Sequence, residues 1–125
     1  MTCGIDLVCV SAFEKLLSES FLRDHFSAAE VAYCESAAGA MAPRLAARYA
    51  AKEAFIKAIE GAHLFRPRLV ARVVYHEIEV AHDPHGRPYL LLQGAMLKLV
   101  EELKITTCLS LSHDGDYAVA QVVLK

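Results

Sequence analysis

The stretch that decides the fold is Arg48–Ala58, which reads RYAAKEAFIKA and places one acid and three bases on an otherwise small and apolar helix. Glu53 and Lys57 lie four residues apart, so both side chains project from one helical face. There they could hold a divalent metal and neutralise the phosphates that the metal binds. They could equally form an exposed Glu–Lys pair of the kind that many helices carry.

The helix around this stretch is expected to start near Pro43, a residue that suits a first helical turn, and to continue to Glu60 before it stops at Gly61. It is rich in alanine, a good helix former. Such small side chains also allow a strand to approach the helix closely. The alanines concerned are at positions 46, 47, 50, 51, 54 and 58.

A single carboxylate, Asp6, interrupts an apolar run from Cys3 to Val10 that is typical of a buried strand. A carboxylate in such a run is costly unless it is paired or bound to a cation. Close approach of this strand to the alanine-rich helix would bring Asp6 within a few ångströms of Glu53. Two carboxylates from separate elements would then share one cation.

Near the C-terminus, a strand-like run meets Ser112 and His113 and turns through Asp114-Gly115-Asp116 into a second strand. Taken alone, His113 is a surface or structural histidine, and Ser112 is suited to a local turn of its own.

The remaining patterns complete a mixed fold. Ser27 and Glu30 form a capping-box signature for a helix, and the alternation around Ile78 and Val80, between Glu77 and Glu79, predicts a strand with one solvent-exposed face. The sequence predicts helices near residues 11–18, 27–35, 43–60 and 95–103, and strands near residues 3–10, 73–81, 89–92, 106–112 and 117–124. Together these elements predict one α+β domain over residues 1–125, in which an antiparallel sheet packs on a long central helix.

Composition limits the class of protein. With 55% hydrophobic and 22% charged residues over 125 positions, the chain is globular and has the length of one domain. No apolar run reaches the roughly 20 residues of a membrane span, and the N-terminus lacks a signal-peptide pattern, so a cytoplasmic protein is expected. A net charge of -2 and a pI near 6.3 argue against a nucleic-acid partner.

The four cysteines, Cys3, Cys9, Cys34 and Cys108, contain no C-x-x-C pair. Neither a zinc site nor a redox dithiol is therefore indicated, and all four are interpreted as small buried hydrophobic residues.

Four short motifs occur in a specific order: Gly4-Ile5-Asp6, the KEAFIKA segment 52–58, the Gly-x-Pro turn 86–88 and the SLSH segment 110–113. In this order and spacing the chain resembles the holo-acyl-carrier-protein synthase family, the short single-domain type of the 4′-phosphopantetheinyl transferase superfamily. The resemblance extends from Gly4 to Leu124.

The resemblance implies a reaction and roles for three residues. The phosphopantetheine arm of coenzyme A passes to a serine of an apo-acyl carrier protein, and adenosine 3′,5′-bisphosphate is released. Asp6 and Glu53 would bind Mg²⁺ that bridges the pyrophosphate, and Lys57 would neutralise further charge. Either Glu53 or a metal-bound water beside it would accept the serine proton.

The resemblance also implies a coenzyme A site. Arg48, Ser112 and His113 would contact its phosphates. The turn formed by Gly86, Arg87 and Pro88 would border the adenine, although a Gly-x-Pro turn between strands needs no ligand to explain it.

Relatives in this family form homotrimers whose active sites lie between subunits, so the same assembly is expected here. The turn at Gly86 of one chain would complete the site that Asp6 and Glu53 build in its neighbour.

Many members of the family carry an arginine six residues beyond the aspartate, where it engages the acidic carrier protein. Here that position is Ala12. Either Lys15 and Arg23 replace the arginine, or the carrier docks through apolar contact around Phe13, Leu17 and Phe21. The sequence does not decide between these, nor between a carrier of fatty acid biosynthesis and one of a specialised pathway.

Two other interpretations compete with an enzyme. One is a non-catalytic module that binds coenzyme A or a nucleotide. The other is a structural trimer component in which salt bridges neutralise Asp6 and Glu53.

Overall fold

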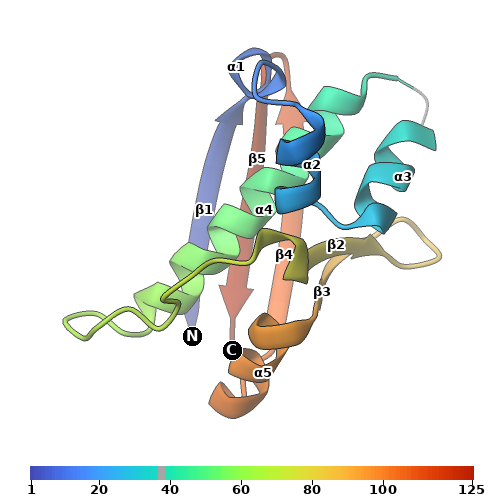
Figure 1. The fold of residues 1–125 in the computed structure, drawn as a ribbon. Coiled ribbons are helices and arrows are strands. Elements are labelled where there is room, and N and C mark those ends of the chain that lie inside the picture. Colours follow the sequence, from blue (N-terminus) through green and yellow to red (C-terminus); the bar gives the residue numbers. More distant parts are fainter. Residues whose placement is uncertain (37–38) are drawn as a thin grey trace.

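The computed structural model describes residues 1–36 and 39–125 (Figure 1). Its elements, in chain order, are β1 (Thr2–Cys9), α1 (Val10–Glu14), α2 (Glu19–His25), α3 (Ala28–Ser36), α4 (Met41–Gly61), the 3₁₀ helix η1 (Tyr75–Glu77), β2 (Ile78–His82), β3 (Pro88–Leu92), α5 (Gly94–Leu103), β4 (Thr107–Asp114) and β5 (Tyr117–Leu124).

The strands form two antiparallel sheets. One is three-stranded in the order β1-β5-β4, and the other is the hairpin β2-β3. In the larger sheet β1 pairs with β5 from Thr2 opposite Leu124 to Cys9 opposite Tyr117. Helix α4 packs along β1 and β5. The predicted α+β architecture, an antiparallel sheet on one long helix, is confirmed.

Gly4 allows β1 to lie directly on α4. A side-chain carbon at this position would collide with the carbonyl oxygen of Ala54 and lie 2.8 Å from the backbone nitrogen of Ala58. Both alanines are fully buried. The strand therefore approaches the helix as the alanine-rich sequence predicts, and only glycine fits at this contact.

The segment after β1 differs from the prediction. The sequence predicts one helix near residues 11–18, whereas α1 ends at Glu14 and a separate helix, α2, begins at Glu19. Ser18 caps α2, because its Oγ accepts a hydrogen bond of 3.1 Å from the backbone nitrogen of Phe21. The prediction missed α2, although its capping serine is visible in the sequence.

A second departure concerns Phe13, which the sequence offers as a docking residue for the carrier. Its side chain is buried, with 3% exposure, and its ring packs edge-on against that of Phe26 at 6.4 Å. With Leu45 and Val10, these rings belong to a hydrophobic core under α1, α2 and α3. Apolar docking through Phe13 is therefore wrong, since the ring is already in contact with the protein itself.

The strand predicted over residues 73–81 is shorter. Residues Tyr75–Glu77 form η1, and β2 covers only Ile78–His82. Glu79, predicted to face solvent, is buried at 7% exposure because helices α3 and α4 both contact β2. The wet face predicted for this strand is wrong.

The cysteines are only partly as predicted. Cys34 is buried and Cys9 is half-buried, but Cys3 and Cys108 are exposed. Cys3 and Cys108 stand opposite Val123 from its two sides in the three-stranded sheet. Both therefore belong to the face of the sheet that points away from α4.

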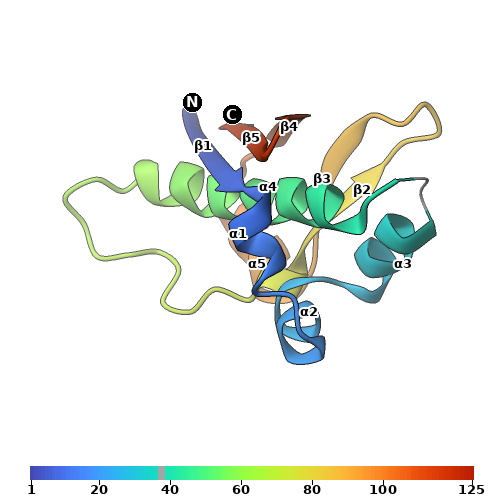
Figure 2. The same cartoon turned by 90° about the horizontal axis from the view of Figure 1, so that it is seen from above.

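That outer face is uncovered in the single chain and carries exposed apolar side chains on β1. Ile5 and Leu7 on β1 are 60% and 64% exposed. Figure 2 shows the helices on the other side of the three-stranded sheet. Among the described residues, no helix is both long and apolar enough to cross a lipid bilayer.

Candidate active site

Helix α4 carries two sets of polar side chains on different sides. Tyr49, Glu53 and Lys57 follow one another at intervals of four residues, so they form a stripe along one side of the helix. Arg48 and Lys52 form a second stripe, which begins beside Tyr49. Both stripes drift around the helix, so Lys57, nine residues or about two and a half turns after Arg48, points to the side of the helix opposite Arg48.

Lys57 joins α4 to β1. Its Nζ donates to Oδ1 of Asp6 at 2.9 Å and to the carbonyl oxygen of Ile5 at 3.1 Å. The Lys57 side chain is 54% exposed and that of Asp6 is 17% exposed. The ion pair seen for Lys57 is therefore with the strand, rather than with Glu53 as in the alternative of an ordinary helical Glu–Lys pair.

Glu53 is held by tyrosine instead. The hydroxyl of Tyr75 donates to Oε1 of Glu53 at 2.7 Å. The ring of Tyr49 stacks on that of Tyr75, with centroids 5.9 Å apart and planes at 11°. Burial and the interaction with Glu53 raise the pKa values of both tyrosines, so the two hydroxyls stay protonated.

Asp6 lies beside this face of α4 through its ion pair with Lys57, which follows Glu53 by one helical turn. The Asp6–Lys57 pair and Glu53 therefore lie on the same side of the helix.

This group suits a magnesium ion, although not a closed metal cage. Within residues 1–36 and 39–125, no cluster of three or more His, Cys, Asp or Glu side chains could hold a metal. Mg²⁺ commonly uses one or two carboxylates and completes its shell with water and substrate phosphates. Asp6 and Glu53 offer that donor set, with the hard oxygen ligands that Mg²⁺ prefers.

A second group of predicted residues gathers around Arg48. Arg48, Ser112 and His113 line one small cavity of about 170 Å³ between α4 and β4, together with Tyr33 and His82. The structure therefore brings these three predicted phosphate contacts together. Ser112 and His113 are exposed, whereas Arg48 is 3% exposed.

The guanidinium of Arg48 is only partly satisfied. Its Nη1 donates to the carbonyl oxygen of Arg44 at 3.0 Å, and its carbon lies 4.7 Å from the centre of the Tyr33 ring. Its Nε is buried and has no hydrogen-bond partner. His82 stacks on Tyr33 at 4.6 Å, and burial followed by the charge of Arg48 lowers the pKa of His82. This cavity is thus positively charged and holds an unused donor.

The predicted adenine-binding turn lies apart from the Asp6–Glu53 group, but it directly follows His82 of the cavity around Arg48. Gly86 has a positive φ of 81°, and Asp83 closes the turn by accepting from the backbone nitrogen of Arg87 at 2.9 Å and from its Nε at 2.6 Å. In Figures 1 and 2 this hairpin projects away from β1, and Pro88 only begins β3. Within one chain the turn does not join Asp6 and Glu53.

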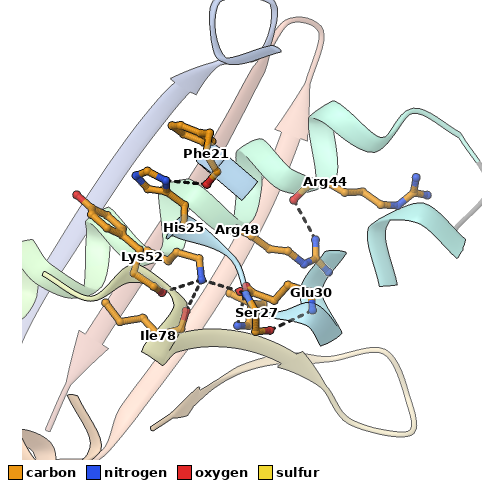
Figure 3. Close-up of polar contacts among 10 residues, drawn as sticks. Phe21, His25, Ser27, Glu30, Arg44, Arg48, Lys52 and Ile78 are labelled. Atoms are coloured by element: carbon orange, nitrogen blue, oxygen red, sulfur yellow. Dashed lines mark hydrogen bonds and ion pairs between the residues drawn. The ribbon is translucent and has the colours of Figure 1, made fainter. Parts of the chain in front are cut away.

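Lys52, the remaining base of the decisive stretch, has a structural place. Its Nζ donates to Oε1 of Glu30 at 2.7 Å, to the carbonyl of Ile78 at 2.7 Å and to the carbonyl of Tyr75 at 3.0 Å (Figure 3). The side chains of Lys52 and Glu30 are both 0% exposed. Burial lowers the pKa of Lys52, and the negative charge of Glu30 opposes that change.

Glu30 is satisfied from three directions. It accepts from the backbone nitrogen of Ser27 at 3.0 Å, which confirms the capping box, from that of Val80 at 3.0 Å and from Lys52. The pair therefore ties α3 and α4 to β2. Sequence patterns gave no indication of it, since its members are 22 residues apart.

Tyr75 and Tyr49 were also missed as site residues. The spacing of Tyr49 one turn before Glu53 is a signal that could have identified it. Tyr75 has no such signal, because only the tertiary fold brings η1 beside α4.

Comparison with known proteins identifies the superfamily of the chain. A family model described as the 4′-phosphopantetheinyl transferase superfamily matches residues 2–122. The chain belongs to this superfamily.

Two relatives of known name show to which kind of protein in this superfamily the chain is similar. The chain is 43% identical over 126 residues to the holo-acyl-carrier-protein synthase of Trichlorobacter lovleyi, covering 98% of this chain and 94% of that protein. It is 39% identical over 125 residues to the protein of the same name from Nocardia farcinica, covering 98% and 85% of the two chains.

Two solved structures are similar in fold to the chain over nearly its whole length. An ACPS–CoA complex of Chronobacterium ammoniagenes has a TM-score of 0.90 and 38% identity, over 99% of this chain and 96% of that one. The acyl carrier protein synthase of Mycobacterium tuberculosis has a TM-score of 0.78 and 36% identity, over 99% and 96%.

Proposed function

We propose that this chain is a holo-acyl-carrier-protein synthase, which transfers the 4′-phosphopantetheine group of coenzyme A to a serine of an apo-acyl carrier protein. Adenosine 3′,5′-bisphosphate is the second product. The observation that carries the proposal is the convergence of Asp6, Glu53 and Lys57 on one side of α4, in a chain that matches this superfamily over residues 2–122.

In the proposed reaction, the serine oxygen attacks the phosphorus that carries the pantetheine arm, and the bond from that phosphorus to the bridging oxygen of the pyrophosphate breaks. Asp6 and Glu53 hold Mg²⁺, which when bound neutralises charge on the pyrophosphate. Lys57 supplies a further positive charge beside them. Glu53, or a water next to it, takes the serine proton.

The cavity around Arg48 provides the proposed contacts for coenzyme phosphates. A buried donor without a partner is uncommon in proteins, and a phosphate oxygen would satisfy the Nε of Arg48. Ser112 and His113 at the same cavity add further donors.

These two groups also support the proposal of a homotrimer. Lys57 and Arg48 point to opposite sides of α4, so these two groups of a single chain do not face one common site. A neighbouring copy could supply its Arg48 cavity and its Gly86–Pro88 turn to the Asp6–Glu53 group. The exposed apolar face around Ile5 and Leu7 offers a surface for such assembly.

We further propose a cytoplasmic location and a role in fatty acid biosynthesis. Both rest on the family to which the chain belongs.

The proposal is tested by incubating the protein with Mg²⁺, coenzyme A and several apo-carriers and then measuring carrier mass. One carrier should gain the mass of a phosphopantetheine group, and Glu53→Gln protein should produce no gain. Binding of coenzyme A without a mass gain on any carrier would contradict the proposed transfer and favour a non-catalytic module.

A further inference from the structure

We propose that Tyr75 is a positioning residue for Glu53, and this inference rests on the proposed transferase function. Its hydroxyl donates to Oε1 of Glu53 at 2.7 Å. This hydrogen bond engages one oxygen of the carboxylate that the proposed reaction uses. Tyr75 thus fixes the orientation of the carboxylate without touching the substrate.

Tyr75 is suited to this role because both its backbone carbonyl and its side-chain hydroxyl are hydrogen-bonded to α4. Its carbonyl oxygen accepts from Nζ of Lys52 at 3.0 Å, while its hydroxyl donates to Glu53. Lys52 and Glu53 are consecutive residues of one helix. Any movement of η1 relative to α4 would therefore stretch both hydrogen bonds at once.

The side chain of Lys52 is itself held by several contacts. It is fully buried and pairs with Glu30 at 2.7 Å, in addition to its bond to the carbonyl of Ile78. Breaking a buried ion pair is strongly unfavourable, so Lys52 is held in place beside the carbonyl oxygen of Tyr75.

The ring of Tyr75 is also packed against other aromatic rings. Tyr49 stacks on it at 5.9 Å, and the His25 ring lies 4.8 Å from it. His25 stacks in turn on Phe21 at 4.0 Å. A hydroxyl carried on a ring packed in this way can hold a carboxylate in a single orientation.

The hydroxyl of Tyr75 acts as a hydrogen-bond donor, because its partner is a carboxylate oxygen of Glu53 at 2.7 Å. Groups that hydrogen-bond to a metal-binding carboxylate typically change metal affinity or activity by about 10–100-fold when they are removed.

The test replaces Tyr75 by phenylalanine, which keeps the stacked ring and removes only the hydroxyl. With coenzyme A present, Mn²⁺ binding followed by electron paramagnetic resonance should weaken about 10-fold. The turnover number should fall by a similar factor, while the Michaelis constant for coenzyme A stays within about twofold. Tyr117→Phe, which removes the hydroxyl of a tyrosine that is 53% exposed, should change neither quantity.

A double-mutant cycle separates positioning from general damage to the fold. In a Glu53→Gln background, Tyr75→Phe should cause no further loss of Mn²⁺ affinity, because the group it positions is gone. An undiminished effect in that background, or unchanged Mn²⁺ affinity in the single variant, would overturn the inference.

Failure of this inference and failure of the proposed function are distinguishable. If wild-type protein binds Mn²⁺ and the Tyr75→Phe protein binds it less well, yet no carrier gains mass, the positioning role stands and the transfer does not. If wild-type protein binds no Mn²⁺ even with coenzyme A, the role of Glu53 as a metal ligand fails, and the inference fails with it.

Discussion

The ammonium group of Lys57 lies 2.9 Å from a carboxylate oxygen of Asp6, on a different element of the fold. Glu53, one turn earlier on the same helix, is bound instead by a tyrosine hydroxyl. Lys57 therefore balances the charge of Asp6 in this structure. In the proposed reaction its half-exposed ammonium would also contact a phosphate of coenzyme A.

We expect Lys57→Met to weaken coenzyme A binding with little change in melting temperature. The ion pair is more than half exposed on the lysine side, and exposed pairs contribute only about 0–1 kcal/mol to stability. Isothermal titration calorimetry and thermal unfolding measure the two quantities, with the exposed Lys98→Met as a matched control. Unchanged coenzyme affinity together with a lowered melting temperature would show that Lys57 is structural.

Asp6→Asn and Glu53→Gln should each lose most transfer activity while remaining folded, because each removes one of the two carboxylates proposed to hold Mg²⁺. Initial rates at saturating Mg²⁺, with circular dichroism as the check on folding, test this expectation. Near-normal turnover in either variant would contradict a cation shared by the two carboxylates.

Lys52→Met should destabilise the protein by about 3–5 kcal/mol, since it leaves the carboxylate of Glu30 buried without its partner. Denaturant unfolding measures this loss, and Lys57→Met on the same helix provides the comparison. A loss below about 1 kcal/mol would mean that the buried pair is not the link between α3 and α4 that the geometry indicates.

Phe13→Ala should lower stability by about 3–5 kcal/mol, because its ring fills a core and not a docking surface. With Phe13 buried, we expect carrier docking to depend on the exposed Lys15 and Arg23 more than on the half-buried Leu17 and Phe21. The Michaelis constant for the carrier should accordingly rise steeply with salt and in Lys15→Ala. A Michaelis constant insensitive to both would show that charge does not guide docking.

Leu7→Lys should prevent assembly, because Leu7 is 64% exposed on the uncovered face of the three-stranded sheet. Light scattering should report a monomer, and transfer activity should be lost with the assembly. Leu64→Lys, at a similarly exposed leucine in the loop after α4, should leave the proposed trimer intact. A fully active wild-type monomer at assay concentration would exclude sites shared between subunits.

The parts of the fold that the sequence predicts well are those decided by neighbouring residues. Ser27 and Glu30 cap α3 as their spacing indicates, and the alanine-rich helix lies against Gly4 as its small side chains allow. The same close approach was expected to bring Asp6 near Glu53, and the ion pair that the structure shows for Asp6 is with Lys57, one turn further along α4.

Contacts between distant segments were beyond the reach of such patterns. Glu30 looked like a capping residue, yet the fold also buries it against Lys52. Tyr75 lay within a predicted strand, whereas η1 turns its hydroxyl toward Glu53. Cys3, in an apolar run, is exposed because one face of the sheet is uncovered in the single chain.

The position of Asp6 depends on Gly4, a residue that takes no part in the proposed reaction. Any side chain at Gly4 would strike the backbone of α4 at Ala54, and Asp6 is only two residues further along β1. A variant such as Gly4→Ala would leave every reacting group chemically unchanged and still displace the carboxylate from its partners. In a survey of natural variants, position 4 should therefore tolerate substitution as poorly as position 6.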